Sequence, residues 1–247
     1  KGEKERNSAQ MLKAYMWLMK SQDILTPDSF YVGLRDLEQW AKQTKQPMDR
    51  AILHSLIAEF YANYAADNQW QLRQRTEIVG ETPSADIREW TANMFVEKVR
   101  TNVKEALADS LLLLKTSSRN YIPFVELGET SEYYHHDMYH LLASRAIRAL
   151  NQIERLERGS FNGITASPVK QDIINIYERM TDAYETAGLK EGYVLTMLQY
   201  LEWKRDNDNK LQPVQLKKGL GEWTADTYNA ALDELKRQFK SEPICAE

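Results

Sequence analysis

The stretch SPVKQDIINIYERMTDAYETAGLKEGYVLTMLQYL, residues 167–201, predicts two helices joined by a tight turn. Pro168 suits the first turn of a helix, because proline lacks the N–H group that would have no partner there. Gly188 stands where a left-handed residue ends a helix, and Leu189 begins the return helix at once. Between them runs an apolar stripe at helical spacing, made of Val169, Ile173, Ile176, Tyr177, Met180, Tyr184 and Ala187. The segment therefore predicts a helical hairpin.

Proline recurs at the start of amphipathic segments, at Pro27, Pro47, Pro83 and Pro168. Apolar residues follow each of these prolines at helical spacing, and no segment alternates with a period of two. The pattern predicts an all-α fold of antiparallel helical hairpins stacked as a tetratricopeptide-like array. The helices follow one another about two dozen residues apart, although the strict repeat signature is absent. Gly192 fits the small residue that such repeats usually place in the hairpin.

Two longer segments follow the same helical period. We expect one helix from Ile87 to Leu114, with a kink or a short break near Arg100 to Asn102. About 28 residues would be long for a globular helix, which averages about 10–14. A second helix is expected from about Ser131 to Glu157, after an irregular segment that contains Pro123.

The segment GSFNGITAS, residues 159–167, is the best candidate for a linker or hinge, because glycine and serine punctuate it. A division into two subdomains therefore stays open beside a single array. In that case residues 1–158 form an N-terminal helical subdomain and residues 168–247 a C-terminal hairpin subdomain.

The composition excludes several functional classes. With 247 residues, of which 43% are hydrophobic, the chain can bury a substantial core. A net charge of −4 and an isoelectric point near 5.7 argue against a protein that binds nucleic acid or coats anionic membranes. The mean hydropathy is −0.60, and no apolar run approaches the ~20 residues of a membrane span, so we expect no direct membrane insertion.

Cys245 is the only cysteine, so an internal disulfide and a cysteine-based zinc site are both excluded. A single cysteine leaves the redox compartment open. The chain begins at Lys1 rather than at an initiator methionine, and we expect it to be part of a longer precursor.

Three of the four histidines lie in the segment HHDMYH, residues 135–140. If this segment is helical, Glu132, His136 and His140 face nearly the same way and offer three ligands to a divalent metal. The motif of a zinc hydrolase is absent, because no glutamate directly follows the first histidine. The helical angle also directs His136 and His140 away from the expected core, so a polar surface without metal is the simpler interpretation.

Six tryptophans and thirteen tyrosines allow two interpretations, a set of ligand platforms or packing between helices. Packing with polar tips at the rim is the simpler of the two. The densest aromatic patch beside the irregular segment is Tyr133 and Tyr134 with Tyr139, and we expect these residues to be the first candidates for a partner-binding surface. The tryptophans are Trp17, Trp40, Trp70, Trp90, Trp203 and Trp223.

No constellation of catalytic residues is recognisable in the sequence. Carboxylate pairs such as Glu89 with Glu97 fit ordinary helix faces, without the apolar surroundings that mark a catalytic acid. There is no nucleophile elbow and no glycine-rich loop between a strand and a helix. We therefore predict a protein that is not an enzyme and that uses no cofactor.

Patterned packing residues occur in six segments: MLKAY (11–15), LTPDSFY (25–31), ILHSLIAEFY (52–61), YIPF (121–124), YYHHDM (133–138) and the hairpin from 176 to 202. Together they resemble the helical N-terminal region of very large bacterial alpha-2-macroglobulin-like envelope proteins. Members of that family are similar to protease-trapping inhibitors, in which a protease cuts a bait region and a Cys-Gly-Glu-Gln thioester captures it in some members. That motif is absent here, and Cys245 stands in Cys-Ala-Glu instead.

The resemblance implies a helical prefix in the bacterial cell envelope, periplasmic or surface-anchored, that carries no trapping residue. Three functions follow from the sequence. The first is a non-enzymatic interaction or scaffold module of such an envelope protein, with the rest of a longer chain or an envelope protein as partner. The second is a free-standing helical-repeat adaptor for a peptide or envelope partner. The third is a metal-dependent enzyme centred on the histidines of residues 135–140.

Overall fold

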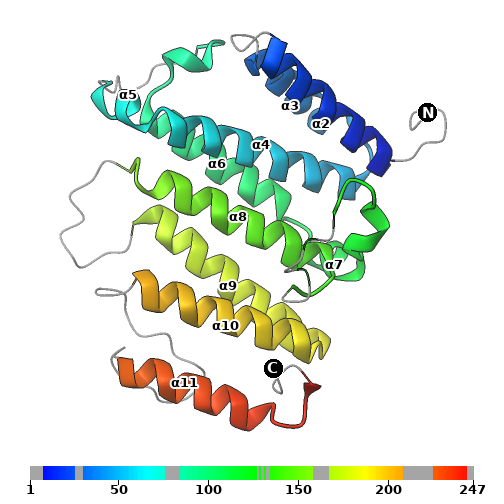
Figure 1. Cartoon of the computed structure of the whole chain (residues 1–247), viewed down its shortest axis with the longest axis vertical. Coiled ribbons are helices and arrows are strands. Elements are labelled where there is room, and N and C mark those ends of the chain that lie inside the picture. Colours follow the sequence, from blue (N-terminus) through cyan, green and yellow to red (C-terminus); the bar gives the residue numbers. More distant parts are fainter. Residues whose placement is uncertain are drawn as a thin grey trace. The chain divides into compact units, whose positions relative to one another are not determined.

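A computed structural model describes residues 8–25, 30–75, 84–126, 128, 131, 134–157, 167–207 and 225–243. Within these ranges every regular element is a helix, so the all-α prediction is confirmed (Figure 1). The chain divides into two compact units, Lys1–Ser131 with His136–Gly159, and Glu132–His135 with Ser160–Glu247. Most of the expected linker, residues 159–166, lies outside the described residues, as do Pro27 and Pro83.

In the first unit, α4 (Pro47–Asp67) is the central helix. Pro47 occupies its first turn, as predicted, and more than half of its residues are buried. Because apolar side chains surround most of its circumference, α4 packs against α3, α6 and α8, and Figure 1 shows it between α3 and α8. The described helices of this unit are α2 (Ser8–Leu25), α3 (Phe30–Gln43), α4, α5 (Gln69–Gln74), η2 (Ile87–Glu89), α6 (Ala92–Ala106), α7 (Ser110–Lys115), η3 (Ser118–Tyr121) and α8 (Met138–Glu154).

Tyr61 of α4 joins three neighbouring elements. Its ring stacks on Trp90 with the centroids 5.3 Å apart, and Trp90 directly follows η2. Its hydroxyl donates a hydrogen bond of 2.9 Å to Glu38 of α3, and Glu38 also pairs with Lys98 of α6 at 2.7 Å. These contacts fix α3 and α6 on α4. They also confirm the packing interpretation for Trp90, which is 7% exposed.

The expected single helix from Ile87 to Leu114 is wrong. The segment forms η2, α6 and α7, and the predicted break near Arg100 lies inside α6. α6 ends at Ala106 instead, and the Asp109 side chain accepts a hydrogen bond of 3.0 Å from the N–H of Leu112. An aspartate in this position satisfies one of the unpaired N–H groups of a new helix, and it competes with continuation of the old one.

The second unit contains the hairpin of α9 (Pro168–Ala187) and α10 (Lys190–Asn207). Ser167 caps α9 and Pro168 occupies its first turn, as predicted. Gly188 has a φ of 69° and a left-handed conformation, so its predicted role in the turn is confirmed. The N–H of Leu189 donates to the carbonyl of Tyr184 at 2.9 Å, as in the hydrogen-bond pattern of an α-helix that ends with a left-handed residue.

The last described helix is α11 (Ala225–Gln238), which packs on α10. Val194 and Met197 of α10 and Leu235 of α11 form the small core of this contact. Between α9 and α10, Tyr177 stacks on Tyr200 at 4.8 Å and lies against the buried Trp203. A tetratricopeptide-like array of the whole chain stays a prediction.

Every described helix is too short or too polar to cross a lipid bilayer.

Candidate functional site

The predicted metal site does not have the helical geometry on which it was based. α8 begins at Met138, about seven residues later than expected. The side chain of Asp137 caps this helix by accepting a hydrogen bond of 2.6 Å from the N–H of His140. His136 therefore precedes the helix, where its carbonyl accepts from the N–H of Ser118 at 3.0 Å. His136 and His140 do not share a helix face.

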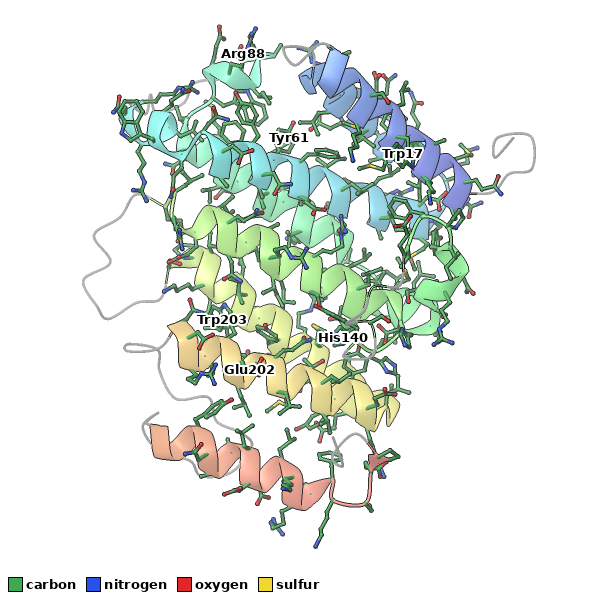
Figure 2. All side chains as sticks on the ribbon, in the orientation of Figure 1. Trp17, Tyr61, Arg88, His140, Glu202 and Trp203 are labelled. Atoms are coloured by element: carbon green, nitrogen blue, oxygen red, sulfur yellow. The ribbon has the colours of Figure 1, made fainter. Side chains whose placement is uncertain are left out.

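His140 is fully buried, so the prediction that it points away from the core is wrong (Figure 2). The helical angle failed because α8 buries a wide face, which also includes Met138 and Tyr139. Glu132 lies outside the described residues. Among the residues that are described, no group of three or more histidine, cysteine, aspartate or glutamate side chains could hold a metal ion.

The three candidate tyrosines have different surroundings. Tyr139 is 1% exposed and belongs to the core of α8, so its prediction as a partner-binding residue is wrong. Tyr133 lies outside the described residues, and Tyr134 is half-buried. The neighbouring His135 packs edge-on against Tyr184 at 5.6 Å, and its Nδ1 lies 3.5 Å from a carboxylate oxygen of Glu191. A role of Tyr134 in partner binding stays a prediction.

The five described tryptophans divide into two groups, and Trp223 lies outside the described residues. Trp90 and Trp203 are buried, and Trp40 meets Tyr15 edge-on at 5.7 Å, as packing predicts. Trp17 and Trp70 do not follow this prediction, because 59% and 73% of their surfaces are exposed. An exposed tryptophan is informative, since it leaves a large apolar ring in water that a binding partner could cover.

Trp17 of α2 is labelled in Figure 2. It stands at the edge of a groove in the first unit, which we call the α2 groove and whose volume is about 580 Å³. On α2 it is lined by Lys13, Met16, Trp17, Met19 and Lys20. α4 supplies Ile52, Ser55, Leu56 and Phe60, and α8 supplies Met138, Leu141, Leu142 and Arg145. Phe124, Val125 and Glu126, which follow η3, complete the lining.

The floor of the α2 groove is apolar and its rim is charged. Ile52, Leu56, Met138 and Leu142 are each less than 5% exposed, whereas the lysines and Glu126 reach solvent. In the floor, the hydroxyl of Ser55 is buried and has no hydrogen-bond partner among the described residues. An apolar concavity of this size with a few polar groups at its edge is typical of binding sites, whose volumes are about 300–1,000 Å³.

Close packing on α3 positions the α2 wall. The hydroxyl of Tyr15 donates a hydrogen bond of 3.0 Å to the carbonyl of Gly33, and burial raises the pKa of Tyr15 to about 12. A Cβ on Gly33 would lie 3.1 Å from the methyl carbon of Met19, so the glycine allows α2 and α3 to approach. At the start of α2, Ser8 donates to Asp49 of α4 at 2.7 Å.

The net charge of the residues that line the α2 groove is opposite in sign to the net charge of the whole chain. Its lining contains three cations, Lys13, Lys20 and Arg145, and one carboxylate, Glu126, which gives a net charge of +2 against −4 for the chain. Lys13 donates to Glu126 at 2.9 Å and holds the pKa of that carboxyl below its usual range. Arg145 pairs with Glu59, and the ammonium of Lys20 lies 5.5 Å from the ring centroid of Trp17.

Reasoning from the sequence missed this groove, although one signal was present. Lys13, Met16, Trp17 and Lys20 follow the spacing i, i+3, i+4, i+7, so they form one stripe along α2. The sequence does not show that this stripe faces a hollow between α4, α8 and the segment after η3.

Comparisons with known protein families, with curated proteins and with solved structures found no match for this chain.

Proposed function

We propose that this chain is a non-enzymatic helical interaction module that binds a protein partner in the α2 groove. The observation that supports it is the exposed ring of Trp17 at the edge of an apolar hollow. Contiguous apolar surface of this kind is rare on proteins that bind nothing, and tryptophan is the residue most enriched at binding hot spots.

The composition of the lining supports a peptide or a helix as ligand. Met16, Met19 and Met138 contribute flexible, polarizable side chains that adapt to different apolar partners, as at other peptide-binding grooves. Helix-in-groove recognition uses such a surface. The catalytic alternative centred on residues 135–140 has lost its geometric basis, because His136 precedes α8 and His140 lies in the core.

We further propose that the module is the helical prefix of a bacterial alpha-2-macroglobulin-like envelope protein. This proposal rests on the resemblance of the packing segments at 11–15, 25–31, 52–61, 121–124 and 133–138. The free-standing adaptor is the alternative, and the reading frame separates the two. β-Sandwich domains encoded downstream would support the prefix, whereas a stop codon shortly after residue 247 would favour the adaptor.

Selection from a random peptide library tests the docking function, with binding of the enriched peptides then measured by fluorescence polarisation. Trp17→Ala removes the exposed ring from the groove, and Trp70→Ala is the matched control, because Trp70 is also exposed but lies on α5. We expect peptides whose affinity falls about tenfold or more in Trp17→Ala and stays unchanged in Trp70→Ala. Peptides that bind Trp17→Ala as tightly as the unmodified chain would contradict the proposal, as would a selection without enrichment.

A further inference from the structure

We propose that the partner segment in the α2 groove is an acidic amphipathic helix, in which two carboxylates seven residues apart bracket two adjacent apolar side chains. This inference rests on the proposed docking function and adds the chemistry of the partner. It is carried by the arrangement of charge and apolar surface along α2.

The order of residues on α2 sets the expected order on the partner. Lys13 and Lys20 stand at the two ends of the stripe, and Met16 with Trp17 lies between them. Seven residues of helix span about 10.5 Å, so the two ammonium groups belong to side chains two turns apart. A partner helix that lies along α2 has the same pitch. It therefore meets both lysines when its own carboxylates are also seven residues apart.

The cations of the rim can accept a new carboxylate without loss of structure. The ion pair of Lys13 with Glu126 joins two exposed side chains, with 33% and 79% of their surfaces in solvent. Exposed pairs of this kind contribute little to stability, so a partner carboxylate can replace Glu126. Lys20 lies on the exposed face of α2 beside Trp17.

Arg145 adds a third positive group on the α8 side of the groove. One of its NH₂ groups donates to Glu59 of α4. A guanidinium has five N–H donors, so it can hold Glu59 and still bind a partner carboxylate. The lining thus carries more positive than negative groups, which attracts acidic segments and disfavours basic ones.

A helix fits this arrangement better than a single amphiphilic molecule. An acyl chain with one anionic headgroup could fill the apolar floor, but one headgroup offers a single charge to two lysines separated by two helical turns. A helix carries several charges at fixed spacing and a stripe of apolar side chains for the floor. The observations therefore favour a peptide helix, and the acyl ligand becomes an outcome of the test.

The test uses two synthetic probes and the full chain. Each probe is an alanine-rich helical peptide of about 18 residues with two adjacent leucines at its centre, long enough to populate a helix. In one probe glutamates bracket the leucines seven residues apart, and in the other lysines occupy the same two positions. Affinities are measured by fluorescence polarisation at low ionic strength, and dodecanoate is titrated separately by calorimetry. We expect the glutamate probe to bind about tenfold tighter than the lysine probe.

Two double variants localise the effect. Lys13→Gln with Lys20→Gln should abolish the preference for glutamate, whereas Lys42→Gln with Lys45→Gln should retain it. The second pair is an equal change of charge at exposed residues outside the groove. Equal binding of both probes would overturn the acidic partner and leave the docking function standing. Binding of dodecanoate together with no binding of either probe at about millimolar concentration would overturn the helical occupant.

Discussion

The backbone of Gly192 on α10 lies directly against the ring of Tyr184 on α9. A Cβ on residue 192 would be 2.5 Å from Cε1 of that tyrosine, closer than carbon atoms approach in proteins. Tyr184 is fully buried, so its ring has no free direction in which to move. The close packing of α9 on α10 at this point therefore requires a glycine at position 192.

Gly192→Ala should destabilise the second unit by about 1–3 kcal/mol, because overpacking outweighs the higher helix propensity of alanine. Urea unfolding followed by circular dichroism measures the change. Gly33→Ala is the matched control, since the added carbon meets the flexible end of Met19 at 3.1 Å instead of a fixed ring. We expect a much smaller effect there, and an equal effect at both sites would contradict the account of the hairpin.

Gly188→Val should destabilise the same hairpin by about 1–2 kcal/mol or more, because β-branched residues strongly disfavour a φ of 69°. Gly188→Asn should cost less, since asparagine tolerates the left-handed region. Thermal unfolding of the two variants gives the comparison. Nothing lies within 4 Å of an added Cβ at Gly188, so equal losses would point away from backbone conformation.

Asp137→Ala should weaken the start of α8 by about 0.5–2 kcal/mol, because the N–H of His140 loses its partner inside the protein. Asp109→Ala removes the same kind of cap from α7, where water can replace the carboxylate because Asp109 is exposed. The loss of stability in urea should therefore be larger for Asp137. A larger loss for Asp109 would show that the cap of α8 is not what determines where the helix begins.

Alkaline pH should destabilise the first unit through its tyrosines. Burial raises the pKa of Tyr15 to about 12, and burial together with Glu38 raises that of Tyr61 further. Between about pH 10 and pH 12 the unfolded chain releases the Tyr15 proton first, so the folded state binds more protons and stability falls as the pH rises. Tyr15→Phe should reduce the fall of the urea midpoint between about pH 10 and pH 12. An unchanged pH dependence in this variant would contradict the assignment.

Local signals in the sequence predicted much of the fold. Pro47 and Pro168 mark true helix starts, and Gly188 marks a true turn, because each acts within a few residues of backbone. The start of α8 was missed because the apolar period suggested an earlier beginning. The cap at Asp137 and the pairing of the segment before it, where the N–H of Met138 donates to the carbonyl of Thr116 at 2.8 Å, decided the outcome.

The candidate site could not be predicted in the same way. Its walls come from residues 13–20, 52–60, 124–126 and 138–145, which only the tertiary structure brings together. Both Trp17 and Trp90 stand among apolar residues at helical spacing, and only the structure shows that Trp17 is exposed and Trp90 is buried. His140 shows the reverse error, since a polar residue beside an apolar stripe was assigned to the surface and lies in the core.

Methyl NMR of the methionines is the most direct test of the claim that the α2 groove binds an acidic helix. Three of the eight methionines line the groove, and Met180 and Met197 of the second unit are natural internal controls. Titration of the ¹³C-methyl-labelled chain with the glutamate probe should shift the signals of Met16, Met19 and Met138 and leave those of Met180 and Met197 in place. Shifts confined to Met180 and Met197, or no shifts at saturating probe, would contradict the claim.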